Sequence, residues 1–319
     1  MAINTLLARF PIIEVILRHL YWRVPLLTSK LRGIRRRPSP AQPALQGILD
    51  EFKTMVLQLG VGAGDVVIVH AETSRFWRSG HSVKDIIYCL QEIVGPAGTI
   101  AMPAIPLLKD EPRPEDRFDD SLFAKPFTYN KGKDRIWTGI LPLALSRQPG
   151  AHLSSIPLNT MVAVGPKAQH IVEAQEFDER MTACGPASPW AKCYALDAKI
   201  LMIDVDVAHS LTMTHTVEDL FEEEWPIKNW YRPRRFRVID GHKTIDLKMR
   251  ERRPDWALFY CEKRFNKDLL EQRVFHYGET PSGLSLAVGT SKGLIDFLRG
   301  KRPSTYPYFI PRLIGKRRA

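Results

Sequence analysis

The chain has 319 residues, of which 44% are hydrophobic and 25% are charged, and its formal net charge is +11. This composition is that of an ordinary globular protein, and it excludes a disordered, a collagen-like and a coiled-coil chain. The four cysteines, Cys89, Cys184, Cys193 and Cys261, lack the CxxC or CxxH spacing of a zinc module and are not arranged as a disulfide framework. We therefore expect a reducing, cytoplasmic environment.

The positive charge lies mainly at the two ends of the chain. Residues 1–43 carry a net charge of +7, residues 299–319 also carry +7, and residues 44–298 sum to −3. A nucleic-acid-binding domain usually has its basic stripe on the folded body together with a recognisable motif, and the sequence has neither. The histidines also lack HxH or HxxxH spacing, so we expect no nucleic-acid partner and no bound metal.

The most apolar stretch is residues 6–27, which four charged residues interrupt. A membrane-spanning helix needs about 20 consecutive apolar residues, and a cleaved signal peptide needs an uninterrupted apolar run, so the sequence favours neither. A basic run follows at 30–37. Residues 1–37 are therefore predicted either to bind an anionic membrane surface or to pack on the protein itself or on a second copy.

Three segments are expected along the chain. Residues 1–43 form a basic amphipathic segment that ends in a proline-rich linker at 37–43, where each proline removes a backbone donor and disfavours a helix. Residues 44–298 form an α/β domain. Residues 299–319 form a basic tail.

A change in hydrophobic pattern predicts the elements of the α/β domain. A helix over 44–59 precedes a run of β-branched residues at 65–70, which is typical of a strand buried on both faces of a sheet. A helix from Ser82 to Val94 and a second buried strand at 98–103 complete a βαβ unit. Further strands are predicted at 160–165 and 198–205, and further helices at 138–147, 166–174 and 214–224.

The sequence changes character after residue 230. Asp240-Gly241 lies between alternating apolar and polar residues, which is the strongest short-range signal for a β-hairpin. The expected fold class is therefore α/β, with three layers in the order α/β/α. We expect a mixed, mainly parallel sheet and an antiparallel hairpin insertion in the C-terminal half.

Several segments resemble the aminoglycoside 3-N-acetyltransferase family and occur in the family's order. They are LGVGAGD at 59–65, VGPAGTIAMP at 94–103, TGILPLALSR at 138–147, CGPASPW at 184–190 and HTVE at 215–218. The resemblance covers most of residues 45–225. It implies the transfer of an acetyl group from acetyl coenzyme A to an amine on a sugar.

The resemblance also implies a serine-rich loop that contacts the cofactor just after the first strand. Backbone amides and hydroxyls at the starts of loops and helices hold the pyrophosphate of such cofactors. The candidate contacts to acetyl coenzyme A are His70, Thr73, Ser74, Arg75, Thr138 and Gly139.

The sequence departs from the family at residues 155–160. The family pattern there is His-Pro-x-His-Ser, in which the resemblance assigns the second histidine as the catalytic base. This chain has Ile156, Asn159 and Thr160 at the positions of the two histidines and the serine. Because an amide does not accept a proton at any relevant pH, the usual base is missing from the usual place.

Three explanations stay open. In the first, His215 is the base, and Glu218, three residues later and hence on the same helix face, orients it. In the second, the acceptor has changed, Asn159 only orients the amine, and proximity supplies a large part of the acceleration. In the third, activity is lost and the protein is an acetyltransferase-like binding or scaffold module at the membrane surface.

The acceptor is expected to be an amino sugar, either aminoglycoside-like or a precursor of a cell-envelope polysaccharide, which an enzyme at the inner membrane face would serve. Asp206, at a strand end, and Asp219 and Glu222, in an acidic stretch that favours a cationic amine, are the candidate contacts. The region 228–267 has 13 basic and 5 acidic residues and favours an anionic group such as a sugar nucleotide. These alternatives stay open, as does a homo-oligomer.

Overall fold

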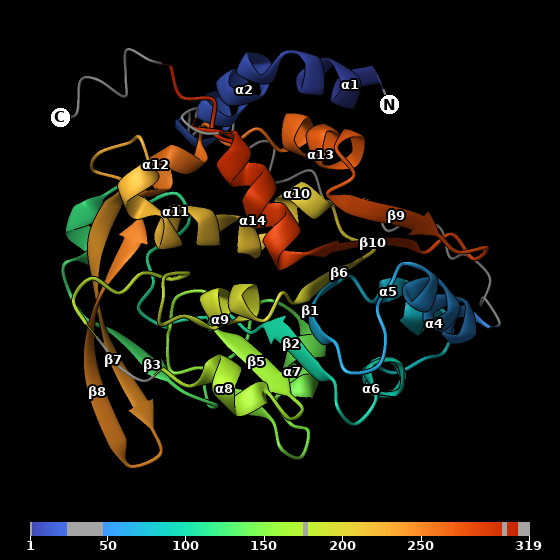
Figure 1. Ribbon diagram of the computed structural model, residues 1–319. Helices are drawn as coiled ribbons and strands as arrows, with labels where there is room; N and C mark the ends of the chain where they lie inside the picture. Colours follow the sequence, from blue (N-terminus) through green and yellow to red (C-terminus); the bar gives the residue numbers. More distant parts are fainter. Residues whose placement is uncertain (1, 24–46, 175–177, 302–304, 312–319) are drawn as a thin grey trace.

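A seven-stranded mixed sheet with the strand order β4-β5-β2-β1-β6-β10-β9 forms the centre of the molecule (Figure 1). The computed structural model describes residues 2–23, 47–174, 178–301 and 305–311. The strands are β1 (Val66–Ala71), β2 (Thr99–Pro103), β4 (His152–Leu153), β5 (Met161–Val164), β6 (Lys199–Ile203), β9 (Phe275–Glu279) and β10 (Ser285–Thr290). The four strands predicted in this region are confirmed as β1, β2, β5 and β6.

The centre of the sheet is parallel and its margins are antiparallel. β1 pairs in parallel with β2 on one side and with β6 on the other. β5 and β10 run antiparallel to both of their neighbours, so the outermost strands β4 and β9 point the same way as the centre. All strands except β5 and β10 therefore share one direction, and the mixed, mainly parallel sheet is confirmed.

Helices cover both faces of the sheet. They are α4 (Ile48–Gln58), α6 (Val83–Val94) and α7 (Ile140–Leu145) on one face and α8 (Ala168–Val172), α9 (Pro189–Ala195) and α14 (Ser291–Gly300) on the other. Side chains along a strand point alternately to its two faces, so Val66 and Ile68 of β1 join one core and Val67 and Val69 join the other. The run of β-branched residues thus contributes side chains to the cores on both faces of the sheet. The predicted three-layer fold is confirmed.

A second, three-stranded sheet stands at one side of the molecule (Figure 1). It consists of β3 (Phe127–Asn130), β7 (Tyr231–Asp240) and β8 (Lys243–Arg252). β7 and β8 form the predicted hairpin, with Asp240 opposite Lys243 and Gly241 in the turn at a φ of 61°. Such a positive φ favours glycine, which explains the Asp-Gly signal.

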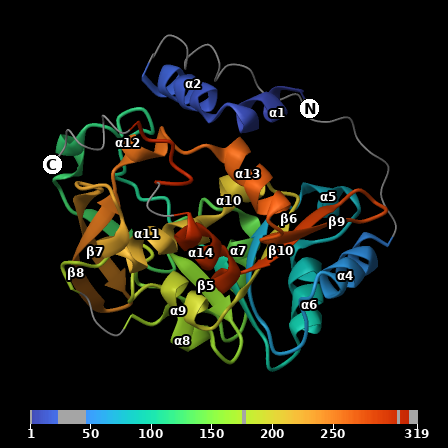
Figure 2. The same cartoon turned by 45° about the horizontal axis from the view of Figure 1, so that its top comes forward.

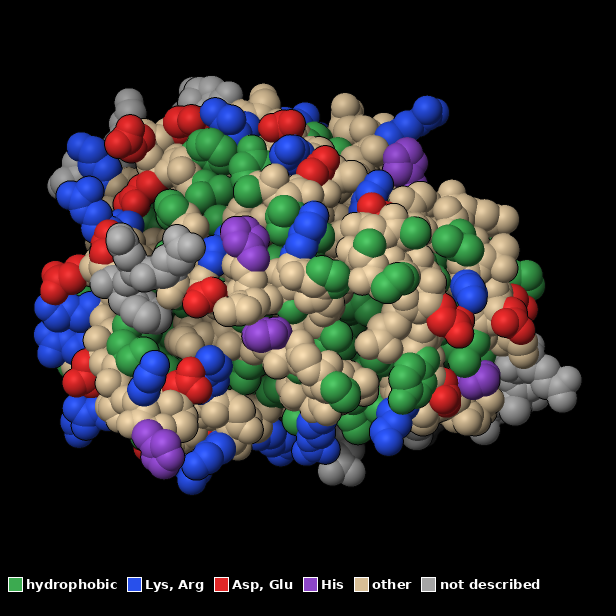
Figure 3. Space-filling view, turned by 60° about the horizontal axis from the view of Figure 1, so that its bottom comes forward, with side chains coloured by type: hydrophobic (Ala, Val, Ile, Leu, Met, Phe, Trp, Pro, Cys, Tyr) green, Lys and Arg blue, Asp and Glu red, His purple; other side chains and the backbone are tan. Residues whose placement is uncertain are grey.

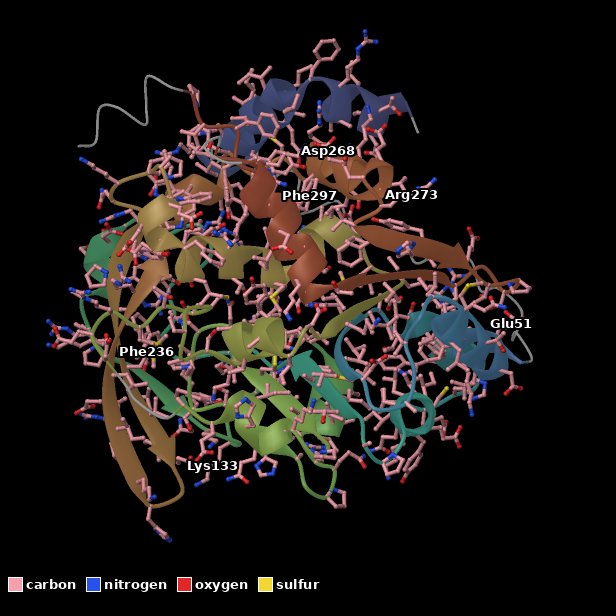
Figure 4. All side chains as sticks on the ribbon, in the orientation of Figure 1. Glu51, Lys133, Phe236, Asp268, Arg273 and Phe297 are labelled. Carbon is pink, nitrogen blue, oxygen red and sulfur yellow. The ribbon has the colours of Figure 1, made fainter. Side chains whose placement is uncertain are left out.

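The arginines of this hairpin divide between its two faces. Alternate residues of β7 are buried, so Arg232 and Arg234 lie inside with Phe236, which Figure 4 labels on this strand. Arg237 points outward and pairs with Asp246. Figure 3 shows basic and acidic side chains mixed along this side of the molecule. The basic region 228–267 is therefore only partly a solvated surface, since Arg232 and Arg234 are buried.

The N-terminal helices α1 (Ala2–Arg9) and α2 (Pro11–Arg23) lie against α13 (Glu262–Glu271) (Figure 2). The buried Glu14 carboxylate accepts hydrogen bonds from the backbone N–H groups of Glu262 and Lys263, at 3.0 and 3.1 Å. These donors begin α13 and have no partner within the helix. The inner face of the N-terminal segment therefore packs on the protein itself.

The outer face of α1 and α2 exposes large apolar side chains. They are Ile3, Leu6, Phe10, Ile12, Ile16, Leu17 and Leu20. Among the described residues, no helix has both the length and the apolar character needed to cross a membrane. The basic run at 30–37 and the proline-rich linker at 37–43 lie outside the described residues.

Two parts of the chain differ from the expectation. The helix predicted over 214–224 is divided into η2 (Thr212–His215), α11 (Thr216–Leu220) and η3 (Glu222–Glu224), because Phe221 leaves the helical conformation at φ −118° and ψ 43°. In the segment expected to be a basic tail, Tyr308 is buried together with Trp225, Trp230 and Trp256.

Candidate active site

The ends of four strands meet at one edge of the main sheet. β1, β2 and β6 are parallel, so their carboxyl ends lie together. β5 begins at the same edge, because it pairs antiparallel with β2 and places Met161 opposite Pro103. The crevice at the carboxyl ends of parallel strands is where open α/β sheets bind ligands. The segments that follow or precede these strand ends therefore supply the candidate site.

A cavity of about 780 Å³ is lined by segments from this edge and by the hairpin. It brings together four residues that the sequence indicated, namely Asn159, His215, Glu218 and Asp219. Its other charged lining residues are Glu111, Arg113, Arg117, Arg232, Arg250, Glu251 and Arg252. A mainly apolar cavity with several charged side chains, at strand ends in a three-layer α/β fold, is typical of a protein that binds small molecules.

His215 ends η2, and its imidazole lines the cavity with 26% of the side chain exposed. Its Nδ1 lies 3.3 Å from Oε1 of Glu218, whose side chain is 1% exposed. The other carboxylate oxygen of Glu218 accepts a hydrogen bond of 3.2 Å from Nε1 of Trp230. The spacing of three residues thus brings the histidine and the carboxylate together, with the carboxylate on the inner side.

Arg252 and Tyr308 complete the surroundings of this pair. The Tyr308 hydroxyl accepts a hydrogen bond from Arg252 and donates one of 2.5 Å to Oε1 of Glu218. Arg252 also lies 3.1 Å from Nδ1 of His215. Because Tyr308 accepts the Arg252 hydrogen, Nδ1 can carry its own hydrogen toward Glu218, and Nε2 is then the unprotonated nitrogen. Nε2 has no hydrogen-bond partner within the described ranges, so it is the nitrogen left to face the cavity.

The surroundings of His215 predict a pH dependence. Burial and the nearby Arg252 charge lower the pKa of His215 from its ordinary value of 6.5. The ring is therefore unprotonated at neutral pH, and an enzyme that uses it as a base loses activity as the pH falls through a value below 6.5. The Glu218 carboxylate acts in the opposite direction, so Glu218→Gln should move this acid limb of kcat/KM to lower pH. Profiles of both proteins measure the limb, and an unmoved limb would contradict the assignment.

Asn159 lines the same cavity in the left-handed conformation, with a φ of 51°, which asparagine adopts more readily than most residues. Its Nδ2 donates a hydrogen bond to Sγ of Cys184 at 3.3 Å, which leaves Oδ1 as an acceptor. Its backbone oxygen accepts a 2.7 Å hydrogen bond from Nε1 of Trp190. The position therefore offers a fixed amide acceptor to a ligand and no base.

Asp219 is held from two sides. Its carboxylate accepts hydrogen bonds from the backbone N–H of Cys184 at 2.8 Å and from the hydroxyl of Tyr231 at 2.7 Å. Burial and the charge of Glu218 raise the pKa of Asp219 to about 6. Asp219 therefore stays a carboxylate at pH 7 and gains a proton as the pH falls through about 6.

A second cavity, of about 590 Å³, lies on the other side of Asp219. It contains Glu222, which pairs with Arg250 through oxygen–nitrogen distances of 2.6 and 2.7 Å, together with Glu223 and Glu224. Asp219 and Arg250 line both cavities. The acidic stretch that the sequence assigned to a cationic amine is thus divided between two cavities.

Asp206 lines neither of these cavities. It caps α10 (Val207–Ser210) by accepting a hydrogen bond from the backbone N–H of His209, and it pairs with Lys263 at 2.8 Å. Its neighbour Asp204 turns toward the loop after β1, where it pairs with Arg75 at 2.7 Å. The strand-end aspartates therefore hold loops together at this edge.

The candidate cofactor residues lie on two neighbouring connections, the loop from β1 to α5 (Ser74–Arg78) and the residues before α7. Both the backbone N–H and the hydroxyl of Ser74 donate to Glu72, at 2.9 and 2.7 Å. The Thr138 hydroxyl donates to the backbone oxygen of Pro103 at 2.8 Å. Gly139 has a φ of 120° and open space where a Cβ would stand. The side chains of Ser74 and Thr138 thus shape the loops, and Gly139 leaves room beside them.

His70, near the end of β1, and Thr73, in the loop that follows, are buried. Nε2 of His70 is buried and finds no hydrogen-bond partner in the described part of the chain. The ring stacks on Trp190, which in turn bonds to Asn159, and burial lowers the pKa of His70 to about 4. A buried polar atom without a partner is unusual in a folded protein, and among the candidate cofactor residues His70 is the one with such an atom.

Sequence reasoning missed Arg252, Tyr308 and Trp230, which surround the His215–Glu218 pair. Arg252 ends the hairpin, and Tyr308 follows α14. They lie 37 and 93 residues beyond His215. Their spacing has no periodicity that links them to His215, and only the tertiary fold brings them together.

The sequence profile of the aminoglycoside 3-N-acetyltransferase family matches residues 68–298. Aminoglycoside N(3)-acetyltransferase IX of Micromonospora chalcea is 30% identical over 175 residues, which are 53% of this chain and 60% of that protein. Aminoglycoside N(3)-acetyltransferase VIII of Streptomyces fradiae is 30% identical over 213 residues, which are 59% of this chain and 69% of that protein. The alignments with the Micromonospora and Salmonella relatives thus span about 60% of those proteins.

Solved structures share the fold. The structure described as AAC-IIIb binary with CoASH has a TM-score of 0.62 at 23% identity and covers 78% of this chain and 93% of its own. A histidine-to-alanine variant of AAC(3)-IVa in complex with apramycin has a TM-score of 0.56 at 21% identity and covers 83% of this chain and 93% of its own. The profile match covers well over half of the chain, and the protein belongs to the aminoglycoside 3-N-acetyltransferase family.

Proposed function

We propose that this protein uses acetyl coenzyme A to acetylate an amino group of an amino sugar. Membership of the family supports acetyl transfer. The observation that carries the proposal is the single cavity in which His215, Glu218 and Asn159 meet. In this proposal His215 is the base, and Asn159 stands where the family resemblance puts the usual histidine.

The proposed reaction joins the acceptor amine to the carbonyl carbon of the acetyl thioester. A C–N bond forms and the C–S bond breaks, while the amine proton moves to Nε2 of His215 and then to the departing thiolate. Glu218 accepts the Nδ1 hydrogen, which fixes the tautomer and favours the imidazolium that forms. Arg252 opposes the imidazolium, so His215 gives up the proton readily. The chain's own groups thus provide both halves of the proton transfer.

Asn159 has an orienting role in this proposal. Its Nδ2 is occupied by Cys184, so Oδ1 is the atom that accepts a hydrogen bond from the acceptor amine or from a neighbouring hydroxyl. Correct placement of an amine beside a thioester contributes a large part of the rate acceleration. The proposed site therefore combines two of the explanations for the missing histidine, His215 as the base and Asn159 as the residue that orients the amine.

Coenzyme A is assigned to the loop from β1 to α5 and to the start of α7. The unpartnered Nε2 of His70 and the open space at Gly139 support this assignment, as does the structural likeness to AAC-IIIb with CoASH. The hydroxyls of Thr73, Ser74 and Thr138 and the guanidinium of Arg75 are the remaining proposed contacts.

Calorimetric titration with coenzyme A and acetyl coenzyme A tests the proposal first. Micromolar binding followed by thiol release with an amino sugar is the expected result. Absence of binding would contradict the proposal. Binding without turnover on any amino sugar would instead favour a catalytically inactive binding module, which the loss of the family histidine at Asn159 also suggests.

The acceptor is proposed to be a precursor of a cell-envelope polysaccharide, met at the cytoplasmic face of the membrane. The support is the exposed apolar face of α1 and α2, including Leu6, Phe10 and Leu17, next to a basic sequence run at 30–37. Apolar side chains and adjoining basic residues together favour an anionic lipid surface.

Vesicle sedimentation tests the membrane assignment. The full chain should sediment with phosphatidylcholine vesicles that contain phosphatidylglycerol, and less in high salt, because the basic residues contribute electrostatically. The double variant Leu6→Ser, Leu17→Ser should remain in the supernatant. Leu270→Ser, which changes an equally exposed leucine on α13, is the matched control. A wild-type protein that stays in the supernatant with these vesicles would rule the assignment out.

A further inference from the structure

Five arginines line the large cavity, and two of them are neutralised. Arg232 pairs with Glu251 at 2.8 Å and with Asp120 at 3.3 Å, and Arg250 pairs with Glu222. The others are Arg113, Arg117 and Arg252. None of these three has a carboxylate oxygen within 4 Å among the described residues.

Arg117 lies against aromatic rings instead of a carboxylate. Its guanidinium carbon is 3.9 Å from the ring centre of Trp22 and 5.0 Å from that of Phe118. Its Nε is buried and has no hydrogen-bond partner in the described part of the chain. Burial and the charges of Arg252, Arg18 and Arg232 lower the pKa of Arg117 to about 10. The aromatic rings hold this cation in place, and Asp255 is the carboxylate that acts on it from beyond ion-pair distance.

Arg252 is also without an ion pair. It donates a hydrogen bond to the Tyr308 hydroxyl and lies 3.1 Å from Nδ1 of His215, and the negative charge that acts on it is the Glu218 carboxylate, which Tyr308 separates from it. Arg113 is exposed and lines the same cavity. Three guanidinium groups therefore lie around one space beside the proposed base.

Among the described residues, the acidic residues of the cavity form no ion pair with Arg113, Arg117 or Arg252. Glu111 and Glu251 are directed to the fully buried Arg234, at distances of 3.2 and 2.9 Å. Glu218 bonds to Tyr308 and His215. Asp219 accepts two hydrogen bonds and has a raised pKa. A polycationic acceptor would meet three arginines without an ion pair here, whereas an anionic group would pair with them.

We propose that the acceptor is an amino sugar that carries a phosphate, and that Arg113, Arg117 and Arg252 bind this phosphate. The inference rests on the proposed function, because it places the acceptor in the cavity of His215. Arginine is suited to the role, since its planar fork donates two parallel hydrogen bonds to phosphate oxygens. The phosphate also neutralises the Arg252 charge beside His215 and so makes the imidazole a stronger base.

Coenzyme A is the other phosphate carrier in the reaction, and the fold separates its proposed site from the arginines. The loop from β1 to α5 lies on the side of the sheet where α4 and α6 pack, near Glu51, whereas the hairpin that supplies Arg252 lies at the opposite side with Phe236 (Figures 1 and 4). The phosphates of coenzyme A are therefore assigned to that loop, its thioester, at the other end of the molecule, reaches His215, and the arginines are assigned to the acceptor.

Steady-state kinetics with paired acceptors test the inference. Glucosamine 6-phosphate should have a KM about tenfold or more below that of glucosamine, because charge-assisted hydrogen bonds to the arginines are added. Uridine diphosphate glucosamine shows whether the site takes a pyrophosphate in place of a phosphate monoester. Arg117→Gln should remove most of the preference. Arg237→Gln, on the outer face of the hairpin and paired with Asp246, should leave it unchanged.

The outcomes separate this inference from the proposed function. Equal KM values for the phosphorylated and the plain sugar, with turnover intact, would overturn the phosphate site alone. A rise in the KM of acetyl coenzyme A in Arg117→Gln, with the sugar unaffected, would overturn it as well, because the arginine would then belong to the coenzyme. Calorimetric titration of glucosamine 6-phosphate needs no turnover, and weaker binding to Arg117→Gln than to wild type supports the site even in an inactive protein.

Discussion

Replacement of His215 by alanine should lower kcat by about 10²- to 10⁴-fold, the usual contribution of a positioned general base, and should leave the Kd of acetyl coenzyme A unchanged. The reason is geometric. His215 lines the cavity, and the buried carboxylate of Glu218 lies 3.3 Å from its Nδ1, so Nε2 is the nitrogen available to a substrate. Thiol release measures kcat, and calorimetry measures the Kd.

His209→Ala is the matched control for this experiment. His209 also pairs with a glutamate, Glu262, at 3.0 Å, but it is largely exposed and lines neither cavity. Its replacement should leave kcat unchanged. Turnover that survives in His215→Ala would mean that Asn159 and proximity alone support the reaction, and it would remove His215 from the mechanism.

The largest expected effect on stability comes from Glu251. Its carboxylate pairs with Arg232 and Arg234, which are 3% and 0% exposed. Glu251→Ala leaves two buried guanidinium groups without their main partner, and the loss of one partner of a buried pair costs about 3–5 kcal/mol. For a protein of this size the melting temperature should fall by roughly 10 °C, as differential scanning calorimetry measures.

Asp246→Ala provides the comparison on the same strand. Asp246 pairs with Arg237 on the outer face of the hairpin, where both side chains are more than half exposed, so its replacement should not shift the melting temperature measurably. Similar melting temperatures for Glu251→Ala and wild type would show that water enters the pair and that the hairpin face is less dry than its burial indicates.

The central strands could be predicted from sequence because each carries its own signal. β1 is a run of β-branched residues whose side chains pack in both cores. The hairpin is predicted by Asp240-Gly241, which lies at a turn that needs a positive φ. The pair His215 and Glu218 could be predicted because its members are three residues apart. In each case the cause of the structure is local, so a short stretch of sequence contains it.

The remaining features depend on contacts between distant segments. Glu14 caps α13 from 248 residues away, and no local pattern distinguishes it from a surface glutamate on an amphipathic helix. Arg234 is an ordinary basic residue in the sequence, yet its interior position follows from the register of β7 against β8. Asp206 and Asp204 are alike as strand-end aspartates, and only the fold decides which one turns toward the loop after β1.

The position of Tyr308 has a consequence for limited proteolysis. The last strand of the main sheet, β10, and the helix α14 end by Gly300, whereas the hydroxyl that bridges Arg252 and Glu218 belongs to a residue beyond them. A cut after Gly300 is therefore expected to remove this bridge and to leave every strand of the main sheet in the chain.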